Sequence, residues 1–225
     1  ELLELSERQV QEYMEQTPGL AMYRHAFDEI FRQKEHVLSK AEENILAQMS
    51  EITSATDDIF TMLNNADIKF GSIEDEEGRQ VEVTHGTYIG LMQSQDRRVR
   101  KDAFDHMYSA YTAQKNTLAT TYSYNVKTDI VGARIRRYAS AMDAALSGDD
   151  VPAEVYDNLI TVINDSLPLL HRYMELRSRM LHLETLHMYD IYVPLVETPK
   201  RKVSYEDALA MINEALAPMG PDYLR

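Results

Sequence analysis

The spacing of apolar residues predicts a chain made mostly of helices. Through the first 65 residues, apolar side chains recur at steps of three and four, which is the period of a helix with one buried face. Ser6 with Gln9, and Ser39 with Glu42, match the capping-box pattern that opens a helix. The pattern predicts helices from Ser6 to near Thr17, over Leu20–Lys34, from Ser39 to about Met49, and from about Thr53 to Asn65.

The pattern changes to a period of two after Asn65. The stretches DIKFGSI and RQVEVT alternate polar with apolar residues, and the connector EDEEG lies between them. Two alternating runs joined by a short Gly-containing loop predict a β-hairpin at about 67–84. The acidic run Glu74–Glu77 has two interpretations, a solvated turn or a calcium loop, although it lacks the D-x-[DN]-x-[DN]-G frame of such a loop.

Helical spacing dominates the rest of the chain. A helix from Asp96 to about Arg137 would be roughly 60 Å long if unbroken, and an interruption near Asn116 or Gly132 is allowed for. Pro168 should kink or divide a later helix, because proline lacks an amide donor. The remaining elements are a helix from His85, a loop over Ser147–Pro152, a helix over Ala153–Leu183, the strand-like stretch IYVPLV, and a helix over Ser204–Ala217. The apolar residues predicted to form the inner face of the helix over Ala153–Leu183 are Val155, Leu159, Val162, Ile163, Leu170, Tyr173 and Met180.

These elements predict a mainly α fold of long antiparallel helices. One small β-hairpin at about 67–84 and a short extended segment near 187–196 interrupt the helices. We expect three parts, an N-terminal helical segment over 1–66, the hairpin over 67–84, and a long-helix part of the same lobe over 85–225.

The composition narrows the classes of function. The 225 residues carry a formal net charge of -14 and include no cysteine. A negative net charge repels phosphates, so no nucleic-acid partner is expected. No stretch approaches the ~20 apolar residues of a membrane span. The first residues also lack the basic start and apolar middle of a secretion signal. We therefore expect a soluble, intracellular protein that has no thiolate metal ligand.

The stretch HLETLH at 182–187 resembles a zinc motif but has the wrong spacing. Its histidines, His182 and His187, are five residues apart, or about 140° around a helix, so a regular helix does not direct both at one ion. A loop that brings them together is the alternative. None of the seven histidines is followed by glutamate, so HExxH is absent. We predict no metal ligand in this chain.

No other catalytic constellation is apparent. The chain has no G-x-S-x-G, no P-loop and no G-x-G-x-x-G, so we predict no catalytic residue. A basic cluster at the start of a predicted helix has two interpretations, a phosphate or carboxylate site and a solvated face paired with nearby acids. Its members are Arg97, Arg98, Arg100 and Lys101.

Five segments in a fixed order resemble oligoendopeptidase F, in the thimet-oligopeptidase-like family of zinc metallopeptidases. They are MLNNADIKF (62–70), VEVTHGTY (81–88), SQDRRVRKDAF (94–104), VPAEVYDNLI (151–160) and LHMYDIYVPLV (186–196). The resemblance covers nearly the whole chain. It implies an almost all-helical, cytoplasmic enzyme whose two lobes enclose a channel for short peptides.

The resemblance also implies where the chemistry lies. Members of the family hold Zn²⁺ on an HExxH motif and a further glutamate, beyond the segment that resembles HMYDIYVPL. We therefore expect the 225-residue piece to bind no zinc and to be inactive alone, with the remaining catalytic domain of the same polypeptide as its partner. We also expect that a lobe separated from that domain exposes apolar surface. The alternative is a non-catalytic helical interaction module related to the peptidase.

Four residues of the extended segment are the candidates for binding the peptide substrate. They are His187, Tyr189, Asp190 and Tyr192, and their polar-aromatic character suits contacts to a peptide backbone. A second interpretation remains open for Asp190, in which it caps or anchors the segment structurally.

Overall fold

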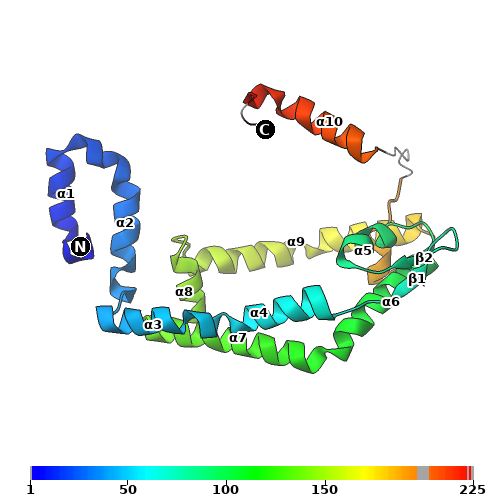
Figure 1. Ribbon diagram of the computed structural model, residues 1–225, viewed down its shortest axis with the longest axis horizontal. Helices are drawn as coiled ribbons and strands as arrows, with labels where there is room; N and C mark the ends of the chain where they lie inside the picture. The colour runs from blue at the N-terminus through cyan, green and yellow to red at the C-terminus, as the bar shows by residue number, and fades with distance from the viewer. Residues whose placement is uncertain (1, 197–202, 222, 224–225) are drawn as a thin grey trace.

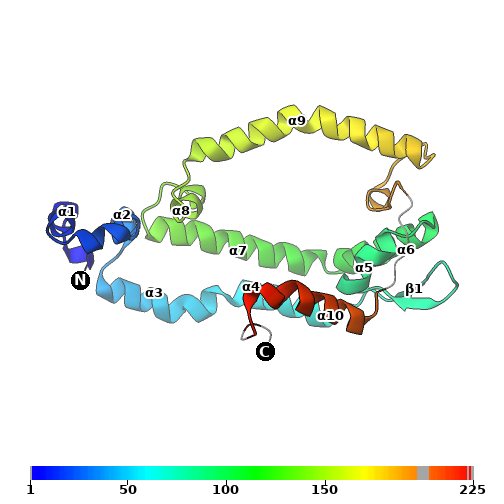
Figure 2. The same ribbon diagram turned by 90° about the horizontal axis from the view of Figure 1, so that it is seen from above.

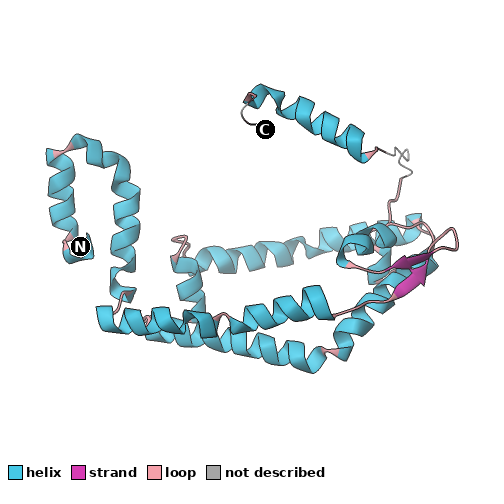
Figure 3. Ribbon diagram, viewed as in Figure 1, coloured by secondary structure: helices cyan, strands magenta, loops and turns pink. Residues whose placement is uncertain are grey.

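Helices make up most of the protein, as the apolar spacing predicts (Figure 3). The computed structural model describes residues 2–196, 203–221 and 223. The α-helices are α1 (Glu7–Gln16), α2 (Arg24–Gln33), α3 (Lys40–Thr53), α4 (Ala55–Met62), α5 (His85–Met92), α6 (Arg97–Ala113), α7 (Lys115–Ile135), α8 (Ala141–Ser147), α9 (Ala153–Met180) and α10 (Tyr205–Leu216). Short 3-10 turns occupy Leu2–Glu4, Pro18–Tyr23, Lys34–His36, Met188–Asp190 and Ala217–Met219, and Leu63–Asp67 forms a π turn.

The first two helices form an antiparallel hairpin that stands at one end of the molecule (Figure 1). Both capping boxes form, since Ser6 accepts the amide of Gln9 and Ser39 accepts the amide of Glu42. The predicted helix over residues 20–34 begins later, at Arg24. The residues before it form a 3-10 turn that starts at Pro18, where the fixed φ of proline suits a first turn.

The predicted β-hairpin is present with short strands, β1 (Ser72–Glu74) and β2 (Gln80–Glu82). They pair antiparallel, with Ile73 opposite Val81. At the tip, the Asp75 carboxylate accepts the amides of Glu77 and Arg79, both at 2.9 Å, and forms an ion pair with the Arg79 guanidinium at 2.7 Å. The carboxylate of Asp75 therefore closes the loop as a turn, in agreement with the first of the two interpretations.

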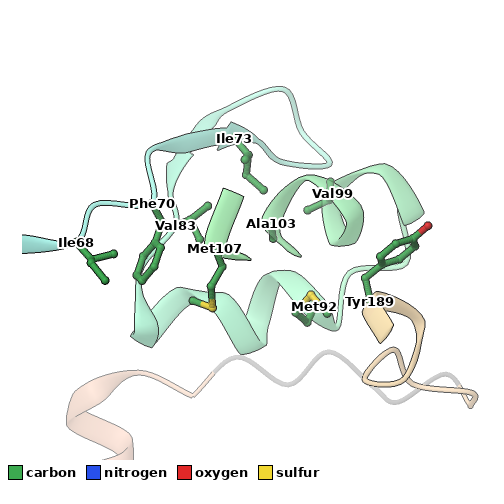
Figure 4. Close-up of a cluster of buried hydrophobic side chains, with 9 residues drawn as sticks. All are labelled: Ile68, Phe70, Ile73, Val83, Met92, Val99, Ala103, Met107 and Tyr189. Carbon is green, nitrogen blue, oxygen red and sulfur yellow. The ribbon is translucent and has the colours of Figure 1, made fainter. Parts of the chain in front are cut away.

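The main hydrophobic core lies where the hairpin meets α5 and α6 (Figure 4). The hairpin and α5 contribute one side of it, and α6 contributes the other through a stripe at steps of four. Tyr189 closes the core from the 3-10 turn Met188–Asp190. The stretch over residues 187–196, predicted as extended, forms this turn followed by bends and contains no strand. The buried members are Ile68, Phe70, Ile73, Val83, Met92, Val99, Ala103, Met107 and Tyr189.

The positions where the sequence predicts an interruption or kink of a long helix behave differently in the structure. The long helix after Asp96 is interrupted at Gln114, near the expected position at Asn116, and it continues through Gly132. Pro168 lies inside α9, which remains one helix of 28 residues. Figure 2 shows α9 as an arch that bends near its middle, so the proline bends the helix without dividing it. The short helix α8, capped by Ser140, has no counterpart in the sequence prediction.

Large apolar surfaces remain exposed on these long helices. The chain has 17161 Å² of accessible surface, whereas a folded monomer of its mass would have about 10,500 Å². Figures 1 and 2 both show α9 running apart from α7 along most of its length. The apolar stripe predicted for the inner face of α9 is exposed at Val155, Leu159 and Ile163. Among the described residues, no helix has the length and apolar character needed to cross a membrane.

Candidate functional site

The segment after α9 is anchored by the carboxylate of Asp190. This side chain is 0% exposed. One of its oxygens accepts a hydrogen bond from Nη2 of Arg100 at 2.8 Å. Both oxygens accept hydrogen bonds from the guanidinium of Arg97, at 3.1 and 2.9 Å. The amide of His187 donates to the same carboxylate at 3.0 Å. Two arginines from the first turn of α6 therefore hold a residue that follows them by about ninety positions.

A third arginine holds the same segment from the other side. Arg177, near the end of α9, is buried and donates to the carbonyl oxygens of Asp190 at 2.9 Å and Val193 at 2.6 Å. It also donates to the Tyr173 hydroxyl at 3.1 Å. Since Arg97 and Arg100 lie on α6 and Arg177 lies on α9, the segment connects the ends of two long helices. We call Asp190 with these three arginines the arginine cluster.

The arginine cluster controls the ionisation of its aspartate. Burial by itself would raise the pKa of Asp190, but the hydrogen bonds from Arg97 and Arg100 outweigh it, and the pKa lies below the ordinary value. The same contact raises the pKa of Arg97. Asp190 therefore carries its negative charge at neutral pH and has no proton to donate.

Two family profiles match successive parts of the chain. The family profile described as "Oligopeptidase F" matches residues 1–70, and that described as "Peptidase family M3" matches residues 90–216, which is more than half of the chain. The chain belongs to peptidase family M3. The family resemblance inferred from the five ordered segments is thus confirmed.

Known members of family M3 are similar over nearly all of the chain. Oligopeptidase PepF of Bacillus subtilis (strain 168) is 46% identical over 99% of this chain and 33% of its own length. Group B oligopeptidase PepB of Streptococcus agalactiae is 45% identical over 99% of this chain and 37% of its own length. The crystal structure of oligoendopeptidase-F from Enterococcus faecium superposes with a TM-score of 0.80 and 45% identity, covering 99% of this chain and 42% of that one. The chain therefore spans between a third and about two fifths of the length of these relatives.

The four predicted substrate-binding residues of this M3 chain divide into two pairs. Tyr189 is part of the hydrophobic core, and Asp190 is buried in the arginine cluster. His187 and Tyr192 are exposed. The His187 ring stacks on the Tyr189 ring with centroids 5.0 Å apart and planes 7° apart. Asp190 therefore has the geometry of a structural anchor, which was one of its two interpretations from the sequence. The exposed side chains of His187 and Tyr192 remain accessible for contacts.

The basic cluster predicted at the start of α6 is fully engaged with acidic side chains. Besides the two arginines on Asp190, Arg98 contacts the carboxylates of Asp96 and Asp102, and Lys101 pairs with Asp105. This matches the interpretation of a paired basic face. One detail differs, because Arg100 is not solvated, with its side chain only 4% exposed.

The described residues do not fit a catalytic metal ion. No group of three or more His, Asp or Glu side chains converges in the part of the chain that the structure describes. His182 and His187 are both exposed, and His182 lies beyond the end of α9 with a φ of 54°. No chemical step through a metal is therefore assigned to these residues.

Arg177 is the functional residue that the sequence prediction missed. It falls four residues after Tyr173 and three before Met180, both of which were assigned to the inner face of the helix. A charged residue at an inward position is the one signal that distinguishes it. That signal predicts burial with partners but does not name those partners.

Proposed function

We propose that this chain is the helical, channel-forming part of a zinc-dependent oligoendopeptidase that hydrolyses internal bonds of short peptides. The observation that carries the proposal is the match to oligopeptidases along 99% of the chain at 46% and 45% identity. The zinc centre is proposed to lie on residues outside this chain, which contains no HExxH. A cytoplasmic location, expected from the resemblance, is part of the same proposal.

The exposed stripe of α9 supports a role as a wall. Apolar side chains such as Leu159, Ile163 and Leu170 are about half exposed on a helix that runs apart from α7. Exposed apolar stripes of this kind are typical of interfaces between parts of a protein. We propose that the catalytic domain of the same polypeptide covers this stripe, since the relatives are between two and three times as long as this chain.

Within the wall, the segment over residues 187–196 is proposed to contact the peptide substrate. Tyr189 and Asp190 fix the backbone, and His187 and Tyr192 present their rings to solvent. Aromatic rings with a polar atom suit both the apolar side chains and the polar backbone of an extended peptide. The described residues therefore bind and orient substrate in this proposal, and take no part in bond breaking.

Peptidase assays on the full-length protein that contains this chain test the proposal. It should cleave internally quenched short peptides, and removal of metal by 1,10-phenanthroline should abolish that activity, with recovery on addition of Zn²⁺. Tyr192→Ala and His187→Ala should raise KM at least five-fold with little change in kcat. Tyr13→Ala and His25→Ala, at exposed sites on α1 and α2, are matched controls; Tyr13 is 47% exposed and Tyr192 48%.

Three results would count against the proposal. A full-length protein without metal-dependent cleavage would support the non-catalytic interaction module. Peptide cleavage by the 225-residue chain alone, free of contaminating protease, would show that the active centre lies within it. Equal KM values for Tyr192→Ala and Tyr13→Ala would remove the segment over residues 187–196 from the substrate path and leave the peptidase assignment intact.

A further inference from the structure

The outer edge of β2 carries hydrogen-bonding groups that have no partner among the described residues. The Val83 amide donates to the Gly71 carbonyl at 2.8 Å, and the Asp75 amide donates to the Arg79 carbonyl at 2.9 Å. In an antiparallel pair the inward bonds fall on alternate residues, so Gln80 and Glu82 turn their backbone groups away from β1. In the described part of the chain, the Glu82 carbonyl alone among these groups is bonded, to the Thr87 hydroxyl at 2.8 Å.

The opposite edge of the hairpin, on β1, is covered at its Glu74–Asp75 end. The guanidinium of Arg98 donates to the carbonyl oxygens of Glu74 at 3.0 Å and Asp75 at 3.1 Å. Proteins usually block exposed strand edges, because these edges pair readily with other strands. Arg98 of α6 thus lies across the end of the β1 edge, which leaves the backbone groups of Ser72 unbonded within the described residues. On the β2 edge, the amides of Gln80 and Glu82 and the carbonyl of Gln80 are unbonded within the same residues.

The two faces beside this open edge differ in chemistry. On the outer face, Glu74 and Glu82 are exposed on neighbouring strands, and neither forms an ion pair with another described residue. On the inner face, Val81 lines a cavity of about 1090 Å³ together with Gly90 and Leu91 of α5. A Cβ built on Gly90 would have no atom within 4 Å, so the cavity is open beside that residue.

We propose that the open edge of β2 binds an extended peptide as an added strand, with lysine or arginine residues alternating with apolar ones. Successive side chains of an added strand point to opposite faces. Basic side chains would lie beside Gln80 and Glu82, with Glu74 one strand further away, and the alternate apolar side chains would enter the cavity beside Val81. The net charge of -14 favours the approach of a basic peptide.

The ligand class of this site rests on the proposed peptidase function, but the site itself is tested by binding. The probe is the acetylated and amidated peptide Thr-Lys-Val-Lys-Val-Lys-Thr, added to the isotope-labelled 225-residue chain. The amide resonances of Gln80 and Glu82 should shift saturably, and their hydrogen exchange should slow at least ten-fold.

A pair of proline variants separates the two edges. Gln80→Pro removes an outward amide that has no partner in the part of the chain that the structure describes, so the hairpin should tolerate it, and peptide affinity should fall at least ten-fold. Ser72→Pro makes the same change on the edge of β1 and should leave affinity within two-fold. Glu82→Gln should lower the affinity for the lysine peptide and leave the affinity for a peptide with glutamine in place of lysine unchanged. An unshifted amide resonance of Val83 shows that each variant retains the hairpin.

Peptides methylated on nitrogen give a test that needs no variant protein. Methylating the alternate residues whose amides face β2 should abolish binding, and methylating the other residues should leave affinity within a few-fold. Equal effects of the two methylation patterns would overturn the proposal, as would equal binding by Gln80→Pro and the unmodified chain. Protection of the Gln80 amide without peptide would also overturn it, showing that another segment or a second copy already covers the edge. Loss of hydrolysis in the full-length enzyme with this binding intact would count against the peptidase assignment alone.

Discussion

Replacing Asp190 by alanine should detach the segment over residues 187–196 from α6. Asp190 supplies the one carboxylate in the arginine cluster, and its removal leaves the buried guanidinium of Arg100 without a counter-charge. It also leaves the amide of His187 without its acceptor. The affected residues connect the ends of α6 and α9, so the change should be felt across both helices.

The magnitude follows from the burial of each partner. Removing one member of a buried ion pair costs about 3–5 kcal/mol, and the Arg100–Asp190 pair is of this kind because the two side chains are 4% and 0% exposed. The Arg97 side chain is 41% exposed, so its pair adds at most about 1 kcal/mol. Asp190→Ala should therefore lower the free energy of unfolding by about 3–5 kcal/mol. Asp102→Ala, which removes a half-exposed carboxylate from α6, should cost about 0–1 kcal/mol.

Urea denaturation of the three proteins measures these differences, and hydrogen exchange at the His187 amide localises them. The double variant Arg100→Met with Asp190→Leu should recover at least about 2 kcal/mol relative to Asp190→Ala, since apolar replacement removes both buried charges. A loss below about 1 kcal/mol for Asp190→Ala, equal to that of Asp102→Ala, would refute the assignment of a buried anchor.

The carboxylate of Asp190 should also make the free energy of unfolding depend on pH in the acidic range. Because the folded-state pKa of Asp190 is lowered, its stabilising contribution is complete above the unfolded-state pKa of about 3.9. That contribution is lost as the pH falls through the lower, folded-state pKa. The slope of unfolding free energy against pH below about 4 should therefore be smaller in Asp190→Asn than in the unmodified chain. Parallel slopes would contradict the pKa direction.

Four further predictions concern single positions. Gly71→Ala should cost about 1–2 kcal/mol in urea denaturation, because its φ is +77° and a Cβ would lie 3.3 Å from Nδ1 of His106, whereas Gly90→Ala should gain up to about 1 kcal/mol because its site is open. Burial raises the pKa of Tyr88 to about 12, so the ultraviolet titration difference between the unmodified chain and Tyr88→Phe should appear near that pH. Ser39→Ala removes the cap of α3 and should cost about 1 kcal/mol, which thermal unfolding by circular dichroism measures.

The features that depend on local sequence were predictable. The capping boxes at Ser6 and Ser39, the period-two runs of the hairpin and the break near Asn116 each involve residues a few positions apart. Helix α8 was missed because its seven residues span about two turns, too few to establish an apolar period. The exposure of the α9 stripe was also not readable from its spacing, since an apolar period identifies a face but does not say which element covers it.

The role of Asp190 shows where a single sequence stops being informative. Its strongest partners lie on α6, 93 and 90 residues earlier in the chain, and no local pattern relates positions so far apart. The sequence singled out both the arginines and the aspartate, but assigned them to separate features. Their contact in the fold shows that the segment over residues 187–196 is anchored to α6. Because Asp190 is buried and held through its carboxylate and its carbonyl, the exposed rings of His187 and Tyr192 stand on a fixed backbone. A ligand that meets those rings therefore loses little free energy to ordering the protein.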